Sequence, residues 1–168
     1  PDIDRDIKVD IPHDFLIKQP RNPKSSAGAQ NGFFDGTWGA YSKYVKFGDE
    51  AHYILDIDGA YACARIYLNN DLLDMHPHGY TPYLVDISDR AVRGINNLVK
   101  ITTQNIQPST RWYSGAGVYR DVFLWSGGKV RIEPWDMFIN TLSVDNGCGK
   151  VEFKTEISSD TETEAEIE

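Results

Sequence analysis

The chain has 168 residues and a formal net charge of −8; 40% of its residues are hydrophobic and 25% are charged. These values are typical of a globular protein, and a chain of this length buries enough surface to fold without disulfides or metals. Its 17 lysines and arginines are scattered and outnumbered by acidic residues, which argues against nucleic acid as a partner.

The sequence also predicts no membrane partner, because no stretch of 18 or more apolar residues is present. The N-terminal residues lack the basic start and apolar core of a signal peptide. They begin at Pro1 rather than at an initiator methionine, so we expect a processed or excised piece of a longer protein. The cellular compartment therefore stays open.

The first forty residues combine one short strand signal with a long irregular stretch. Period-two alternation predicts a strand over residues 7–13 that ends at Pro12. We expect His13 and Asp14, which follow, to satisfy backbone groups of a turn rather than to form a polar site. Residues 18–40 form a loop of a length that is often functional. Its aromatic residues, which predict that part of it packs down, are Phe33, Phe34 and Trp38.

Regular strand signals continue through the middle of the chain. Asp58-Gly59 and Asn69-Asn70-Asp71 are strong turn sequences, and no amphipathic helix of ten or more residues is evident before position 128. One helical turn is expected within residues 88–97. Strands are predicted over residues 40–47, 53–57, 60–68, 72–76, 83–87, 98–105 and 118–125. Many short strands with Gly, Pro and Asn turns predict an all-β protein, built as an antiparallel sandwich or jelly roll.

The strand pattern restarts after Ser126-Gly127-Gly128, which predicts a domain boundary there. We therefore expect one domain over residues 1–127 and the start of a second over residues 128–168. Further strands are predicted over residues 130–139, over residues 150–157 and near Glu168. About 40 residues are too few for a sandwich of about 100 residues, so the second domain is expected to be truncated.

The sequence offers few groups that could carry chemistry. Cys63 and Cys148 lie far apart and predict free, buried thiols rather than a disulfide framework. His76 and His78 flank a proline, and without a third ligand nearby they predict turn and packing roles rather than a metal site. No cofactor or metal is expected.

Carboxylates are plentiful, and a pair of them would be needed to hydrolyse a glycoside. None falls in an apolar context that would raise its pKa, and no nucleophile elbow, phosphate loop or Cys-x-x-Cys motif is present. The sequence therefore predicts no self-sufficient catalytic apparatus. The strand carboxylates are interpreted as lying on solvated faces: Asp56, Asp58, Asp71, Asp74 and Asp86.

The most unusual segment is the loop at residues 107–122, between two predicted strands. Its aromatic and arginine residues surround two glycines, although a connector between strands usually has only a few polar residues. Trp and Tyr expose a large apolar area on a solvated loop, so the loop either packs against its own domain or faces something outside it.

Several motifs resemble the N-terminal domain of glycoside hydrolase family 2, in order and with consistent spacing over residues 7–125. The most specific is the block from Gln107-Pro108-Ser109-Thr110-Arg111-Trp112-Tyr113-Ser114-Gly115-Ala116-Gly117 through Val118-Tyr119-Arg120-Asp121-Val122, in a form similar to the β-galactosidase branch. The others are Pro12-His13-Asp14-Phe15, Asp58-Gly59-Ala60-Tyr61, Ile66-Tyr67-Leu68-Asn69-Asn70, His78-Gly79-Tyr80-Thr81-Pro82-Tyr83-Leu84-Val85-Asp86-Ile87 and Asn96-Asn97-Leu98-Val99.

This resemblance implies a galactose-binding-like jelly-roll β-sandwich, followed by the first strands of a truncated immunoglobulin-like sandwich. In the family these precede a catalytic (β/α)₈ barrel, which needs about 250 residues. The retaining mechanism uses two barrel glutamates, so we expect no catalytic residue in this chain and no activity from it alone. The implied partners are a β-galactoside and the downstream barrel domain, and a homo-oligomer stays open.

The resemblance also implies that residues 107–120 form part of the wall of the barrel's active site. Arg111, Trp112 and Tyr113 are the expected substrate-binding residues. The guanidinium of Arg111 would hydrogen-bond sugar hydroxyls, and the indole of Trp112 would stack on the ring. An alternative of about equal weight is that Trp112 plugs the end of the jelly roll and Arg111 pairs with a local carboxylate.

This chain departs from the family pattern at several positions. Phe15 replaces the usual Trp, Asn70 replaces a common Gly, and residues 39–43 differ from a Gly-Trp-Tyr-Arg-Lys pattern. The last departure leaves the sugar open. Two further hypotheses remain: a stand-alone carbohydrate-binding module, and a scaffold domain that binds no sugar.

Overall fold

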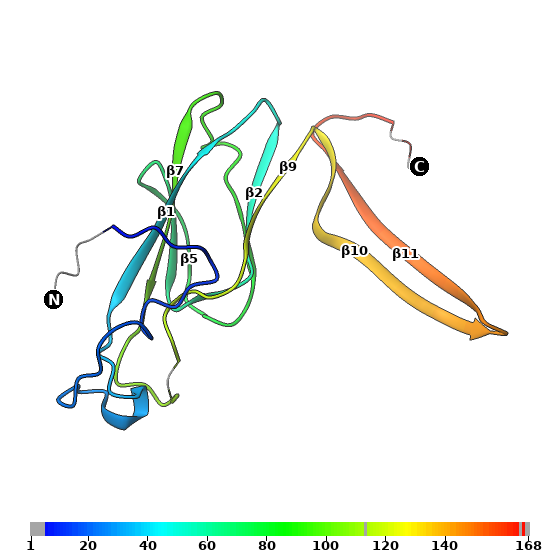
Figure 1. Cartoon of the computed structure of the whole chain (residues 1–168). Coiled ribbons are helices and arrows are strands. Elements are labelled where there is room, and N and C mark those ends of the chain that lie inside the picture. Colours follow the sequence, from blue (N-terminus) through cyan, green and yellow to red (C-terminus); the bar gives the residue numbers. More distant parts are fainter. Residues whose placement is uncertain (1–5, 113, 165, 167–168) are drawn as a thin grey trace.

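The computed structural model describes residues 6–112, 114–164 and 166, and within them it is built of strands and one 3₁₀ helix, η1 (Gly28–Asn31). The all-β prediction is confirmed. Figure 1 shows a sandwich and a two-stranded ribbon that projects from it. The strands are β1 (Trp38–Lys46), β2 (His52–Ile57), β3 (Ala60–Tyr61), β4 (Ala64–Leu68), β5 (Asp71–His76), β6 (Tyr83–Asp86), β7 (Asn96–Gln104), β8 (Gly117–Val118), β9 (Val122–Gly127), β10 (Val130–Asp145) and β11 (Cys148–Ser159).

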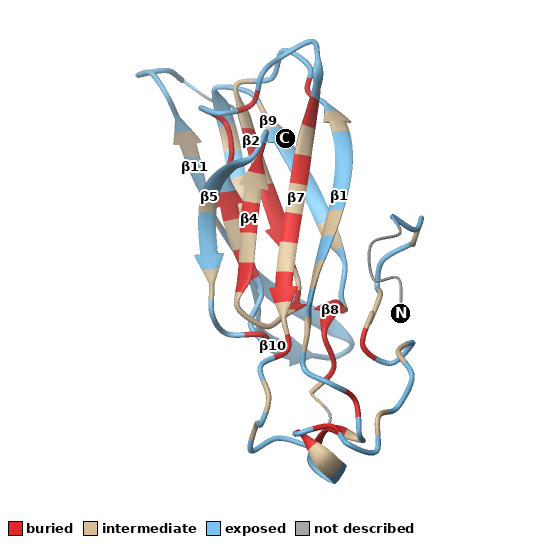
Figure 2. Cartoon of the chain, turned by 90° about the vertical axis from the view of Figure 1, so that its left-hand side faces the viewer, coloured by how far each residue is buried: buried red, intermediate tan, exposed pale blue. Residues whose placement is uncertain are grey.

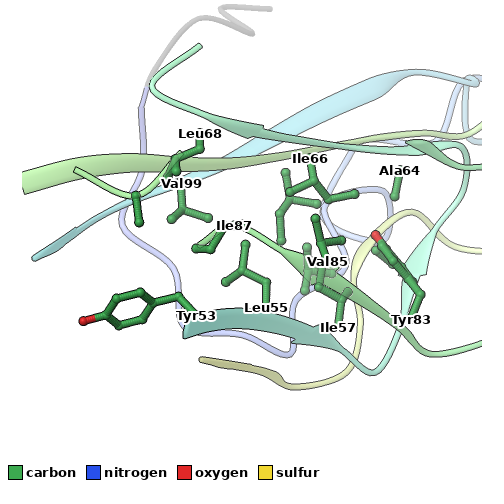
Figure 3. Packing of buried hydrophobic residues seen from close by; sticks show 14 of the residues in the cluster. Tyr53, Leu55, Ile57, Ala64, Ile66, Leu68, Tyr83, Val85, Ile87 and Val99 are labelled. Atoms are coloured by element: carbon green, nitrogen blue, oxygen red, sulfur yellow. The ribbon is translucent and has the colours of Figure 1, made fainter. Parts of the chain in front are cut away.

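The sandwich consists of two antiparallel sheets with the core between them. One sheet has the order β1-β7-β4-β5 and the other β6-β2-β9. Along β7 buried and half-buried residues alternate, as Figure 2 shows, because successive side chains point to opposite faces. The alternating residues of β2, β4, β6 and β7 meet in one cluster, drawn in Figure 3, which includes Leu55, Ile57, Ile66, Val85 and Ile101.

The strand predicted over residues 7–13 is wrong. Residues 6–13 form no strand, and Ile7 and Ile11 remain 67% and 39% exposed. Their alternation therefore does not mark a buried face. The end of this segment instead pairs with the chain near Ala116 and Val118 through isolated backbone hydrogen bonds.

Two predicted strands are each divided in the structure. The segment predicted over 60–68 splits into β3 and β4, and the segment over 118–125 splits into β8 and β9. The short pieces pair with each other, Ala60 opposite Val118 and Tyr61 opposite Gly117. This β3–β8 ladder fixes the C-terminal end of the 107–122 loop against the sandwich.

Strands β10 and β11 form a ribbon in which, within the described residues, each pairs only with the other. The predicted strands over 130–139 and 150–157 are confirmed, although both run longer than expected. The described residues after Ser159 form no strand, so the strand expected near Glu168 is not found among them. The division into domains at residues 127 and 128 stays a prediction.

A cluster of charged side chains, the junction cluster, links the ribbon to the sandwich. His52 Nε2 on β2 lies 2.9 Å from both carboxylate oxygens of Asp160, which follows β11. Arg131 on β10 donates from Nη1 to Asp160 Oδ1 at 3.1 Å and from Nη2 to Glu133 Oε1 at 2.6 Å. The hydrogen bond with His52, reinforced by Arg131, lowers the pKa of Asp160.

Three smaller predictions differ from the structure in whole or in part. Asp56 is buried, 3% exposed, rather than solvated, because Trp125 covers it and donates from Nε1 to its Oδ2 at 3.0 Å. Both cysteines are free, as predicted, but Cys63 is half-buried and Cys148 is exposed, so their predicted burial is wrong. Residues 88–90 form a hydrogen-bonded turn rather than a helix.

Candidate functional site

The loops that carry the candidate residues lie at one end of the sandwich. Strand β7 ends at Gln104 opposite Trp38, where β1 begins, and β5 ends at His76 opposite Ala64, where β4 begins. Because β4 and β7 are neighbours, these ends coincide. Figure 1 shows η1 and the loop after β7 together at this end of the molecule.

The segment after Pro12 anchors the C-terminal half of the 107–122 loop. His13 N donates to Val118 O at 2.7 Å, and Phe15 N donates to Ala116 O at 3.0 Å. Asp14 Oδ1 accepts hydrogen bonds from the backbone of Leu16 at 2.8 Å and of Ala116 at 3.3 Å. The turn role predicted for Asp14 is confirmed, and the contact with Ala116 extends it to the loop.

Beneath this pairing, Tyr41 and His13 pack against Gly117. Tyr41 Oη donates to the carbonyl oxygen of His13 at 3.1 Å and lies 2.9 Å from its Nδ1. Burial raises the pKa of Tyr41 to about 12, whereas burial, followed by the charge of Lys18, lowers the pKa of His13. Gly117 has a φ of 142°, and a Cβ there would overlap His13 O and lie 2.5 Å from Tyr41 Oη.

Asn105 holds the other end of the loop. Its side chain is 2% exposed; Nδ2 donates to Gly115 O at 2.6 Å and Oδ1 accepts from Gln107 Nε2 at 2.8 Å. Its backbone N donates to Thr37 O at 2.7 Å. Because Asn105 bridges the start of the loop and its glycines, it closes the loop at the base.

A small second core supports the same loop from the irregular N-terminal stretch. Leu16, Phe34 and Ala116 bury one another, and half-buried Phe15 packs against them. The prediction that part of residues 18–40 packs down is therefore confirmed for Phe34. Phe33 and Trp38, by contrast, remain 40% and 68% exposed.

The tip of the loop points outward. Trp112 is 74% exposed and Arg111 is exposed, with its backbone N donating to Ser109 Oγ at 3.2 Å. Tyr113, the third expected substrate-binding residue, lies outside the described residues. A fully buried Trp112 would argue against a role in an active-site wall, and the structure does not show one. The binding roles of all three residues stay predictions.

A second loop, residues 77–82, contacts the 107–122 loop through Tyr119, whose Oη donates to Gly79 O at 2.7 Å. His76 stacks on Tyr83 with ring centroids 4.1 Å apart, and His76 Nε2 lies 2.8 Å from Thr81 Oγ1. His78 packs against Tyr80 at 5.8 Å. The turn and packing roles predicted for both histidines are confirmed.

Within the described part of the chain, no group of three or more His, Cys, Asp and Glu side chains is placed to hold a metal ion. No helix among those residues is long and apolar enough to cross a membrane. A cavity of about 240 Å³ lies where β9 meets β10, lined by Ile54, Trp125 and Arg131 among others.

Sequence reasoning selected the exposed tip and missed the residues that hold it. Asn105 was treated as the end of a strand, and Tyr41 as one residue of another strand. The paired glycines in Gly115-Ala116-Gly117 were the available signal, because a glycine between a loop and a strand often marks a close backbone approach. Nothing in the sequence identifies the residue that approaches Gly117.

No protein-family model matches the chain, but its sequence and its fold are both similar to those of known proteins. A β-galactosidase of Bacteroides ovatus is 28% identical over 170 residues, covering 98% of this chain and 20% of that protein. A candidate β-glucuronidase of Formosa agariphila is 29% identical over 89% of this chain and 15% of its own length. The chain thus spans a fifth or less of these relatives.

Solved structures agree with the sequence relatives. A glycosyl hydrolase family 2 member from Bacteroides cellulosilyticus superposes with a TM-score of 0.82 at 26% identity, covering 89% of this chain and 20% of that one. A β-glycosidase from Bacteroides vulgatus has the same fold, with a TM-score of 0.78 at 20% identity. Over nearly its whole length, the chain therefore matches one segment of glycoside hydrolase family 2 proteins, and the family resemblance of its motifs is confirmed.

Proposed function

We propose that the chain is the N-terminal, non-catalytic sugar-binding segment of a family 2 glycoside hydrolase that cleaves terminal β-galactosides. In this proposal the two catalytic glutamates reside on a barrel domain outside the chain. The 107–120 loop forms part of the wall of that active site. The observation that carries the proposal is an exposed Arg111–Trp112 tip on a loop that is anchored at both ends.

The anchoring matters because a binding surface is effective only when it is held in place before the ligand arrives. Asn105 closes the loop at its base, Asp14 and the β3–β8 ladder fix its second half, and Gly117 permits the close packing. A loop without function would need no such support for an indole that stays 74% exposed. Trp and Arg suit sugar, because an indole stacks on the ring and a guanidinium donates to hydroxyls.

The sugar is assigned from the form of the loop motif. The named relatives include both a β-galactosidase and a candidate β-glucuronidase, so their names alone do not choose between the two. The block at 107–122 is similar to the β-galactosidase branch, and we therefore propose a β-galactoside as substrate. Its linkage is not assigned.

We also propose that the ribbon begins a second, immunoglobulin-like domain after residue 127. Adjacent ribbon residues such as Phe138 and Ile139, which point to opposite faces, are 54% and 62% exposed. Strands with apolar side chains on both faces are normally covered on both sides by other parts of a protein. Further strands of the same protein would cover them.

The test uses the full-length enzyme with Arg111→Ala and Trp112→Ala. Each change is expected to lower kcat/KM for an aryl β-galactoside at least tenfold, a loss of about 1.4 kcal/mol of transition-state stabilisation. Tyr44→Ala is the matched control, because Tyr44 is 68% exposed on β1 and pairs with Leu98, toward the opposite end of the sandwich. Unchanged kinetics in both loop variants would exclude Arg111 and Trp112 from the active-site wall. An aryl β-glucuronide assayed in parallel checks the sugar.

A stand-alone carbohydrate-binding module is the second candidate, favoured by the exposure of Trp112 without any barrel present. Titration of the isolated 168-residue chain with galactosides separates the two. Saturable binding supports the module, whereas its absence supports an incomplete wall.

A further inference from the structure

We propose that Tyr80 is a further carbohydrate-contact residue, which stacks on a second sugar ring of an oligosaccharide substrate beside the Arg111–Trp112 tip. This inference rests on the proposed function, because it extends the same wall. It assigns to the 77–82 loop a role in selecting oligosaccharides over simple glycosides.

The ring of Tyr80 is supported from behind and open in front. It packs on Tyr61 with centroids 5.2 Å apart and an interplanar angle of 52°, and against His78 at 5.8 Å and 68°. Despite these contacts, 50% of the residue remains exposed. A half-exposed ring held by two other rings is a preformed apolar surface, because little conformational freedom is left for a ligand to remove.

The position of Tyr80 relative to the 107–122 loop is fixed by the preceding residue. The carbonyl oxygen of Gly79 accepts a hydrogen bond from Tyr119 Oη at 2.7 Å, and Tyr119 belongs to the 107–122 loop. A Cβ on Gly79 would overlap the ring of Tyr61 on β3, so only glycine lets the 77–82 loop lie this close to Tyr61. The phenol of Tyr119 therefore joins the two loops, and Gly79 lets the 77–82 loop pack on β3.

Arg111 lies in the same loop as Tyr119, which binds Gly79. Burial raises the pKa of Tyr80, and the charge of the Arg111 guanidinium offsets part of that rise, so the two side chains interact electrostatically. The exposed residues of the two loops include three aromatic side chains and one guanidinium: Tyr80, His78, Trp112 and Arg111. The chain as a whole carries a net charge of −8, so this composition is local.

That combination matches the chemistry of a polysaccharide rather than that of a protein surface patch. The C–H face of a pyranose stacks on an aromatic ring, while guanidinium and phenol groups hydrogen-bond its hydroxyls. Trp112 and Tyr80 offer two such rings from two loops with a guanidinium close by. Two rings suit a ligand with at least two sugar units.

The experiment compares two substrates of the full-length enzyme: an aryl β-galactoside and a β-galactose-terminated trisaccharide. Tyr80→Ala is expected to lower kcat/KM for the trisaccharide about tenfold, or about 1.4 kcal/mol, with less than a twofold change for the aryl galactoside. Tyr80→Phe keeps the ring and is expected to retain trisaccharide cleavage within about twofold of wild type. Tyr44→Ala is the exposed-tyrosine control.

An equal loss on both substrates would overturn the inference, because a residue that only positions the loop would affect both reactions. No loss on either substrate would overturn it as well. The outcome is separable from the proposed wall, which is tested by Arg111→Ala and Trp112→Ala on the aryl galactoside alone. If those variants retain full activity while Tyr80→Ala selectively loses the trisaccharide, Arg111 and Trp112 are excluded from the wall, while Tyr80 keeps its stacking role in it.

Discussion

Replacing Gly117 by alanine tests whether the loop depends on one close backbone approach. Two costs add at this position. A φ of 142° lies in a region that side chains rarely adopt, and such strain costs about 1–3 kcal/mol. The new methyl group would also overlap His13 O and crowd Tyr41 Oη, and overpacking of this kind costs about another 1–3 kcal/mol. We expect Gly117→Ala to lower the free energy of unfolding by about 2–6 kcal/mol.

The assay is urea unfolding of the isolated chain, followed by tryptophan fluorescence and circular dichroism. Gly149→Ala is the control, because Gly149 on β11 has no atom within 4 Å of an added Cβ. That variant should stay within about 0.5 kcal/mol of wild type, as for most surface changes. If Gly117→Ala unfolds at the same urea concentration as Gly149→Ala, the close approach is not what holds the loop.

Three other changes probe individual contacts. Tyr41→Phe removes a phenol whose pKa rises from 10.0 to about 12 on folding, so between these pH values the variant should lose less stability than wild type. Trp125→Phe leaves Asp56 buried without its indole donor and should cost about 1–3 kcal/mol in urea unfolding. Asp160→Asn should lower Tm at pH 7, because the native carboxylate has a lowered pKa and stabilises the fold when ionised. The Tm difference should shrink as the pH falls through that lowered pKa and the wild-type carboxylate gains its proton.

The tyrosine and tryptophan tests each have a matched control in the chain. Tyr44→Phe changes an exposed phenol and should leave the alkaline unfolding profile as in wild type, while Trp135→Phe changes a 54% exposed indole on β10. A Tyr41→Phe profile that still falls above pH 10 like wild type would assign the alkaline transition to another group. Equal stability of Trp125→Phe and Trp135→Phe would show that the Asp56 contact contributes nothing. A Tm difference for Asp160→Asn that persists in acid would exclude its ionisation as the cause.

Strands such as β4 and β7 could be predicted because their side chains alternate between buried and less buried positions. Ile66 and Leu68 are buried while Arg65 and Tyr67 are half-buried, and period two is a local property of the sequence. The same rule failed over residues 7–13, where Ile7 and Ile11 alternate with polar residues but are exposed and form no strand. Alternation specifies the faces of a strand but not the existence of a neighbour.

The residues of the candidate site also divide into those that the sequence predicts and those that it does not. Arg111 and Trp112 could be selected from their residue types, because a large aromatic group on a loop requires an explanation. Asn105, Tyr41 and Gly117 could not, since their importance comes from partners between 10 and 104 positions away in the sequence. Asp56 was misassigned for the same reason: its alternation with Leu55 and Ile57 was correct, but Trp125, 69 positions away, covers it.

The open ribbon has a practical consequence for every experiment on the isolated chain. Within the described residues β10 and β11 pair only with each other, so both outer edges carry backbone groups that can template another strand. Apolar side chains of the ribbon such as Phe138, Ile139 and Phe153 are more than half exposed. Cys148, the first residue of β11, also has an exposed thiol. We expect concentration-dependent self-association through these strands, together with intermolecular disulfide formation in air. Sugar titrations should therefore be run dilute and under reducing conditions, so that aggregation is not scored as ligand binding.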